Sequence, residues 1–182
     1  MGIRILIATC LVLLSAQAYA ASTERLTPSS IQNFLNESSR MTNPESGYSK
    51  KEIREFLDNH IASRADFITN IIYDIEGYPP QMRKMELSKK AFIQNVTDSV
   101  GKMQDYSSFS KLIQHDITGA GRKADIVVVT GEKGFMPVEG TMVPFDGKTR
   151  CSQILSWKTP HGIVIESANC ETILTIIATE QE

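Results

Sequence analysis

The chain changes from helical to strand periodicity near its midpoint, and this change limits the fold to a few classes. In the first half, apolar residues recur at steps of three or four, as on one face of a helix. From Phe109 onward, β-branched runs alternate with turns rich in glycine and proline. Helices followed by consecutive hairpin strands predict an α+β domain. In it, N-terminal helices including one long helix pack on a curved antiparallel sheet of four to five strands.

The long helix has the clearest start signal in the chain. Ser49 opens a capping box, S-x-x-E, in which the two side chains satisfy free backbone amides. An apolar stripe then continues at helical spacing to Ile75, and glycine and prolines at 77–80 end it. The pattern predicts a helix of about 27 residues, some 40 Å long. Two shorter helices are expected to begin at Thr27 and near Ser88.

The second half contains five strand candidates separated by glycine-containing segments. The segment 118–121, "TGAG", links the first two candidates as a hairpin. The segments 131–134, 145–148 and 158–162 are interpreted as turns or bulges. The predicted strands cover residues 109–117, 124–130, 138–144, 149–157 and 162–177.

The N-terminal residues indicate an exported protein. Arg4 precedes an apolar run too short to span a bilayer, and an A-x-A site ends at Ala20. Residues 1–20 are therefore predicted to be a secretory signal peptide, and the expected location is periplasmic or secreted. Residues 21–27 are expected to be a flexible N-terminus, and 28–182 a single domain.

Charge and hydropathy exclude several classes of partner. The chain has 19 Lys and Arg against 21 Asp and Glu, and removing Arg4 leaves 18 against 21, a net charge of −3. Without a basic excess, nucleic acids and anionic membranes are poor partners. No apolar run after the signal reaches membrane-spanning length.

Cys151 and Cys170 are the two cysteines that remain after signal removal. A structural zinc site requires four Cys or His ligands, and a thioredoxin-type redox site requires C-x-x-C; the sequence offers neither. If 158–162 is a hairpin turn and Trp157 faces Val164, the cysteines lie opposite each other, or within one residue if a bulge intervenes. We therefore predict a disulfide between them.

The order of elements, with "DITGAGRKADIVVVTG" as the first hairpin, resembles the nuclear transport factor 2-like superfamily over residues 28–178. Cystatin-like folds share a long helix wrapped by a meander and are the alternative. The resemblance implies a cone-shaped fold with a pocket between helices and sheet. Isomerases and cyclases of this superfamily place Asp, His or Tyr inside the cone for proton transfer. The resemblance does not imply one activity, because proteins with the same fold can have different functions.

Five residues are candidates for lining such a pocket. None of them matches a catalytic motif of the superfamily, so no catalytic residue is assigned. His115 is followed directly by an aspartate, but neighbours on a strand point to opposite faces and cannot form a simple dyad. The candidates are His60, Asp74, Tyr106, His115 and Trp157.

These observations favour a non-catalytic exported domain that binds a partner protein or a small apolar ligand, without a cofactor or metal. The alternative is a small isomerase- or cyclase-like enzyme with a pocket between helices and sheet. A cystatin-like protease inhibitor ranks last, because no Q-x-V-x-G-like loop is present. A homodimer is a further expectation. Two ionisable groups converging in an apolar pocket would favour the enzyme.

Overall fold

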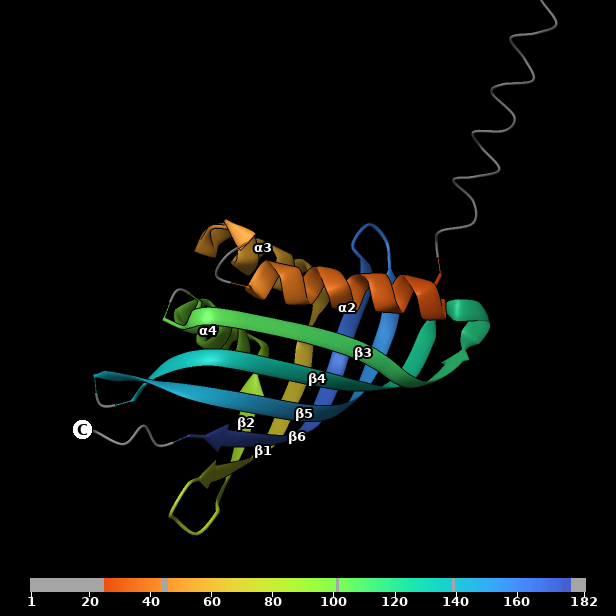
Figure 1. The fold of residues 1–182 in the computed structure, drawn as a ribbon. Coiled ribbons are helices and arrows are strands. Elements are labelled where there is room, and N and C mark those ends of the chain that lie inside the picture. Colours follow the sequence, from red (N-terminus) through yellow and green to blue (C-terminus); the bar gives the residue numbers. More distant parts are fainter. Residues whose placement is uncertain (1–24, 44–45, 101, 139, 178–182) are drawn as a thin grey trace, which may run out of the picture.

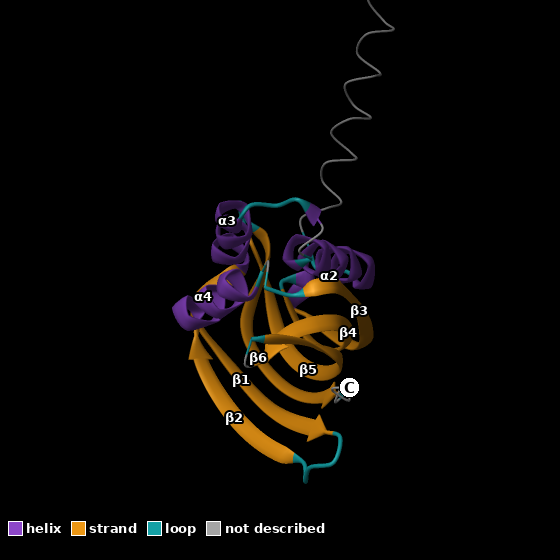
Figure 2. Cartoon of the chain, turned by 60° about the vertical axis from the view of Figure 1, so that its left-hand side comes forward, coloured by secondary structure: helices purple, strands orange, loops and turns teal. Residues whose placement is uncertain are grey.

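The computed structural model describes residues 25–43, 46–100, 102–138 and 140–177. Three α-helices lie on one face of a curved six-stranded sheet (Figures 1 and 2). The sheet has the strand order β2-β1-β6-β5-β4-β3, so the last strand of the chain lies at its centre. The helices are α2 (Pro28–Thr42), α3 (Lys50–His60) and α4 (Lys89–Ser99). The strands are β1 (Ile61–Ile75), β2 (Gln81–Ser88), β3 (Gln104–Thr118), β4 (Lys123–Val138), β5 (Thr141–Lys158) and β6 (Gly162–Ile176).

The prediction of one long helix is wrong. Helix α3 ends at His60, and the chain continues directly as β1. Buried Ala65 and Phe67 alternate with exposed Arg64 and Asp66, which is the two-residue period of a strand. Because isoleucines lie on both faces of β1, some of them are three or four residues apart, which is also the spacing of one face of a helix. Their β-branched side chains favour the strand.

The sheet also differs from the prediction in its size and in the direction of one strand. It has six strands, because β1 and β2 come from the segment expected to be helix and loop. Strand β1 pairs with β6 in parallel, whereas the other neighbouring pairs are antiparallel. The prediction of a curved antiparallel sheet of four to five strands is therefore correct only in its curvature and its hairpins.

The start signals of the three helices are confirmed. The Ser49 hydroxyl accepts from the Glu52 amide at 3.2 Å, and the Glu52 carboxylate accepts from the Ser49 amide at 2.8 Å. Thr27 caps α2, with proline at the first helical position, and Ser88 caps α4. Caps depend on a few adjacent residues, so the sequence alone reveals them.

Two predicted turns lie inside long strands. The segment 131–134 is part of β4, and 145–148 is part of β5. The ring of Phe109 lies against Gly131, where a side chain would collide with it. At these positions glycine permits close approach within the sheet rather than a turn.

The β5–β6 hairpin carries the predicted disulfide. Trp157 pairs with Ile163 rather than Val164, and a bulge farther along β6 restores the register in which Cys151 opposes Cys170. The two Sγ atoms are bonded, with the Cα atoms 4.1 Å apart. The disulfide prediction is confirmed, including its allowance for a bulge.

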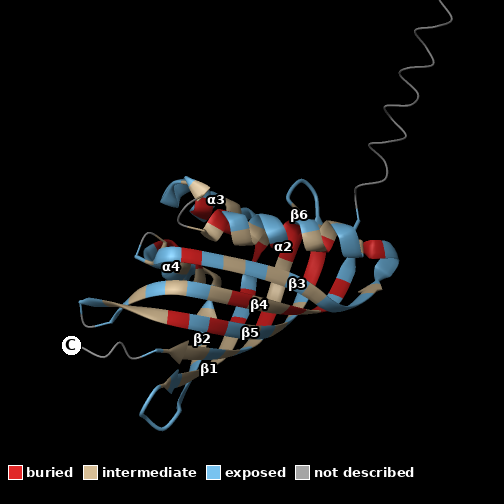
Figure 3. Cartoon of the chain, in the orientation of Figure 1, coloured by how far each residue is buried: buried red, intermediate tan, exposed pale blue. Residues whose placement is uncertain are grey.

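The core has two parts. One lies under α3 and α4 and the other under α2, where Leu26 is buried as well. The buried residues of the helices and strands are red in Figure 3. The Leu26 amide donates to the Gly121 carbonyl at 2.8 Å, which ties the described end of the predicted flexible segment 21–27 to the connection between β3 and β4. The predicted signal peptide, 1–20, lies outside the described residues.

Within the part of the chain that the structure describes, no helix is long and apolar enough to span a membrane. The Cys151–Cys170 disulfide is compatible with an exported protein.

Candidate functional site

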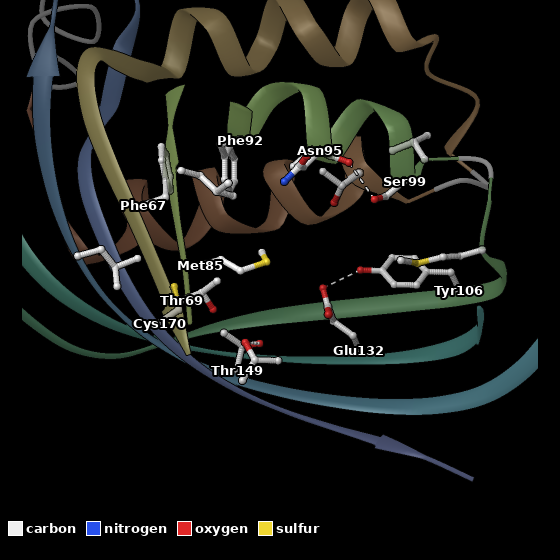
Figure 4. A pocket seen from close by; sticks show the side chains of 17 residues that line it. Phe67, Thr69, Met85, Phe92, Asn95, Ser99, Tyr106, Glu132, Thr149 and Cys170 are labelled. Carbon is white, nitrogen blue, oxygen red and sulfur yellow. Dashed lines mark hydrogen bonds between the residues drawn. The ribbon is translucent and has the colours of Figure 1, made fainter. Parts of the chain in front are cut away.

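A pocket of about 360 Å³ opens between α4 and the face of the sheet that the helices cover (Figure 4). Its walls are mainly apolar. The rings of Phe67 and Phe92 stack at 4.0 Å and form one end. Further apolar side chains line the pocket, namely those of Met85, Leu87, Val96, Val100 and Met103. Such an apolar cavity is of the size that small-molecule sites have.

Two ionisable side chains converge in this pocket. Among its described lining residues, Tyr106 and Glu132 are the only ones that titrate, because Cys170 is held in the disulfide. The Tyr106 hydroxyl donates to Glu132 Oε1 at 2.8 Å. Tyr106 is buried, whereas Glu132 is half-buried. One carboxylate therefore lies among mainly apolar walls and is oriented by a phenol.

Burial of the ring is the main cause that raises the pKa of Tyr106 far above its ordinary value near 10. The nearby charge of Glu132 acts in the same direction, because it disfavours a phenolate. The phenol therefore stays protonated at neutral pH and remains a donor to the carboxylate.

The strand geometry explains how Glu132 reaches the pocket. Ile126, Val128 and Glu132 occupy alternate positions of β4, so the carboxylate shares the inner face with the core residues. Gly147 is its partner on β5. A Cβ atom on Gly147 would lie 3.4 Å from Glu132 Oε2, so glycine there leaves the carboxylate room.

Tyr106 projects from an irregular part of β3. The register of β3 with β4 shifts by one residue, so Asp105 and Tyr106 together oppose Gly134. Asp105 has a φ of 47°, in the left-handed region. A Cβ atom on Gly134 would lie 2.9 Å from the Gln104 carbonyl oxygen, so glycine allows β4 to approach this bulge.

Polar groups also lie across the pocket from Glu132. Figure 4 shows Asn95 and Ser99 on α4 facing the sheet, with the Ser99 hydroxyl donating to the backbone carbonyl oxygen of Asn95 at 2.8 Å. On the sheet side, Thr149 and Thr172 share a hydrogen bond of 2.9 Å. A bound molecule therefore meets one charged group and several neutral hydrogen-bonding groups.

Of the five candidates from the sequence, Tyr106 alone is among the described lining residues of this pocket. His60 lies beneath α2, where its ring contacts Phe34 and Phe56 and its Nδ1 lies 2.7 Å from the Ile163 carbonyl oxygen. Trp157 is half-buried and packs against the core under α2. Asp74 and His115 are exposed on β1 and β3.

Sequence reasoning missed Glu132, because glycines on either side made 131–134 resemble a turn. The signal that could have revealed it is the strand alternation. Side chains two positions apart on a strand point to the same face, as those of Ile126, Val128 and Thr130 do. If the strand continues, Glu132 therefore faces the core as well.

Comparisons with known proteins identify the fold. No family model matches the chain. No curated protein matches it either. Three solved structures are similar. A hexachlorocyclohexane dehydrochlorinase, LinA type 2, is 10% identical, with a TM-score of 0.52 over 85% of this chain and 92% of that chain. A Novosphingobium aromaticivorans protein, provisionally named a scytalone dehydratase, is 9% identical, with a TM-score of 0.51 over 78% and 80%. An NTF-2-like protein of unknown function from Silicibacter pomeroyi is 17% identical, with a TM-score of 0.41 over 80% and 98%.

The fold is nuclear transport factor 2-like. The resemblance predicted from the order of elements is confirmed at the level of the fold by the two structures with TM-scores above 0.5. The interpretation as a non-catalytic binding domain is contradicted, because these neighbours carry the names of enzymes. The expectation that the chain is not an enzyme is corrected on the same ground.

The buried phenol predicts a loss of stability in alkali. Tyr106 is expected to keep its proton in the folded state and lose it in the unfolded state once the pH exceeds about 10. The unfolded state then binds fewer protons, so the free energy of unfolding decreases as pH rises. Urea unfolding at pH 8, 10 and 11 should show a steeper decrease for the wild type than for Tyr106→Phe. Equal slopes would contradict the burial of an un-ionised phenol.

Proposed function

We propose that the protein is a small enzyme that removes a proton from a carbon atom of a small apolar molecule, as lyases and isomerases do. The observation that carries this proposal is the convergence of Glu132 and Tyr106 in an apolar pocket. A carboxylate positioned next to a carbon acid can act as a general base. The chemistry requires only side chains.

Each group has a role in the proposed reaction. Glu132 Oε2 is the base, because Oε1 already accepts the Tyr106 hydrogen bond. Tyr106 orients the carboxylate and stays a donor after proton transfer. The walls around Phe67 and Phe92 hold the apolar body of the substrate and exclude water from it. Asn95, across the pocket, can donate to a polar group of the substrate.

The fold neighbours support this reaction class. A dehydrochlorinase and a dehydratase are named for the loss of HCl and of water. Both reactions are eliminations, in which a base takes a proton from the carbon beside the leaving group. A pocket with one carboxylate among apolar walls suits that step. We further propose that the enzyme works outside the cytoplasm, in the periplasm or as a secreted protein, where its disulfide is stable.

The test uses 5-nitrobenzisoxazole as a probe of carbon deprotonation. A base removes the proton from C3 while the N–O bond breaks, and the electron pair leaves on oxygen to give the coloured 2-cyano-4-nitrophenolate. We expect the wild type to accelerate this reaction about 10²- to 10⁴-fold over an equal concentration of acetate, which is the range of general-base catalysis.

Two tryptophan variants of β2 test whether the reaction takes place in the pocket. Met85→Trp fills the pocket and should lower the rate at least tenfold, whereas Met82→Trp, on the opposite face of the same strand, should leave it unchanged. Circular dichroism establishes that both variants fold. The proposal fails if the folded wild type gives no acceleration, or if Met85→Trp retains the wild-type rate.

A further inference from the structure

The pocket between α4 and the sheet has a negative charge that no cation balances within the part of the chain that the structure describes. Glu132 takes part in none of the salt bridges there. No lysine, arginine or histidine is among the described residues that line the pocket. The other ionisable group, the Tyr106 phenol, stays protonated at neutral pH because burial raises its pKa. The described walls therefore carry one negative charge and no positive charge.

Two lysines adjoin Glu132 in the sheet, and both project from the opposite face. Lys133 follows Glu132 on β4, and Lys148 follows Gly147, the register partner of Glu132, on β5. Consecutive side chains of a strand point to opposite faces, and both lysines are exposed. The alternation that turns the Glu132 carboxylate into the pocket thus turns these two ammonium groups away from it.

The walls of the pocket favour a cation over an anion. Glu132 is half-buried, so part of the water that would solvate its carboxylate is missing, and a bound cation offsets that loss. Three aromatic rings line the pocket, those of Phe67, Phe92 and Tyr106. The faces of such rings carry negative partial charge and attract cations. An anionic ligand would therefore meet like charge at the carboxylate and at the faces of the rings.

The charge and the apolar rings lie at different ends of the pocket. Figure 4 shows Glu132 and Tyr106 towards one end and Phe67 and Phe92 towards the other. A carboxylate oxygen can accept two hydrogen bonds. Glu132 Oε1 accepts one from Tyr106, so it can accept a second from an N–H group of a ligand, while Oε2 stays free for proton abstraction. The pocket therefore fits a molecule with a positive group at one end and an apolar body at the other.

We propose that the pocket binds a small protonated amine with an apolar body, and that molecules of this class are the substrates of the reaction proposed above. The ammonium group donates to Glu132, and the apolar body lies against Phe67 and Phe92. Anions of the same shape are rejected by their charge. The assignment of the amine as the substrate rests on the proposed function, whereas its assignment as a ligand of the pocket does not.

Isothermal titration calorimetry at pH 7 tests the charge preference with three ligands of similar size that share a benzyl group. N-Methylbenzylamine is protonated at this pH, benzyl methyl ether has an oxygen atom in place of its NH2⁺ group, and phenylacetate carries a negative charge. We expect the wild type to bind the amine about tenfold more tightly than the ether, the gain from one partly solvated charge pair. Phenylacetate should bind about tenfold more weakly than the ether, because its carboxylate meets that of Glu132.

Two carboxylate variants show whether Glu132 causes this preference. Glu132→Gln removes the charge and keeps the size of the side chain, so the amine and the ether should bind with about equal affinity. Glu171→Gln removes an exposed carboxylate of β6, next to Cys170 but on the opposite face of the sheet, and should leave the preference unchanged. Circular dichroism establishes that both variants fold.

An absence of amine binding by the wild type would overturn the proposal, as would ether or phenylacetate binding of equal strength. A preference for the amine that persists in Glu132→Gln would overturn the role of Glu132. These titrations also distinguish the ligand class from the proposed reaction, because they measure binding without turnover. A wild type that cleaves 5-nitrobenzisoxazole without preferring the amine keeps the proposed function and overturns the amine proposal. A wild type that binds the amine through Glu132 but accelerates no cleavage confirms the ligand class and overturns the proposed reaction.

Discussion

Replacing Glu132 with glutamine is expected to lower kcat/KM for 5-nitrobenzisoxazole by about 10²- to 10⁴-fold, the range that a general base contributes. Glutamine keeps the size of the side chain and can still accept the hydrogen bond from Tyr106, whose hydroxyl lies 2.8 Å from Oε1. What it loses is the basic oxygen. The substitution therefore separates proton abstraction from the shape of the pocket, and the measurement is the initial rate of product formation.

Two further variants serve as comparisons for Glu132→Gln. Tyr106→Phe removes the hydrogen bond but leaves the base, so it should lower the rate by less than Glu132→Gln does. Glu55→Gln removes an exposed carboxylate on α3 that is not among the described lining residues of the pocket, and it should not change the rate. If Glu132→Gln keeps the wild-type rate while its fold is intact, Glu132 is not the base.

The sequence predicted the features that depend on neighbouring residues. The caps at Thr27, Ser49 and Ser88 were recognised because each lies within a few positions of the amides it serves. The Cys151–Cys170 disulfide was recognised because the hairpin that brings the two residues together is itself local. The fold resemblance followed from the order of these local elements.

Features decided by distant contacts were missed. Residues 61–75 contain isoleucines at spacings that fit a helix and a strand equally, and pairing with β6, about a hundred residues later, selects the strand. Glu132 was hidden for a similar reason. The glycines beside it suit a turn locally, but Phe109 from β3 covers Gly131 and β5 pairs along the whole segment. The base of the proposed reaction therefore lies where local and distant preferences conflict.

Removal of the disulfide is expected to cost about 3 kcal/mol of unfolding free energy, because it closes a loop of about 20 residues in the unfolded chain. For a domain of this size, that loss lowers the melting temperature by roughly 6 to 12 °C. The variant is Cys151→Ala with Cys170→Ala, measured by thermal and urea unfolding. The matched control is Ser152→Ala with Asn169→Ala, the adjacent exposed cross-strand pair on the face of the sheet turned away from the helices, which should change stability by less than about 0.5 kcal/mol.

The same variant distinguishes stabilisation of the sheet from a part in the reaction. Cys170 lines the pocket, but the disulfide joins β5 to β6, whereas Glu132 and Tyr106 project from β4 and β3. Well below its melting temperature, the variant should therefore retain the rate with 5-nitrobenzisoxazole within a few-fold. An unchanged melting temperature would contradict the stabilising role. A loss of rate as large as that of Glu132→Gln, at a temperature where the variant is folded, would make the disulfide part of the reactive site.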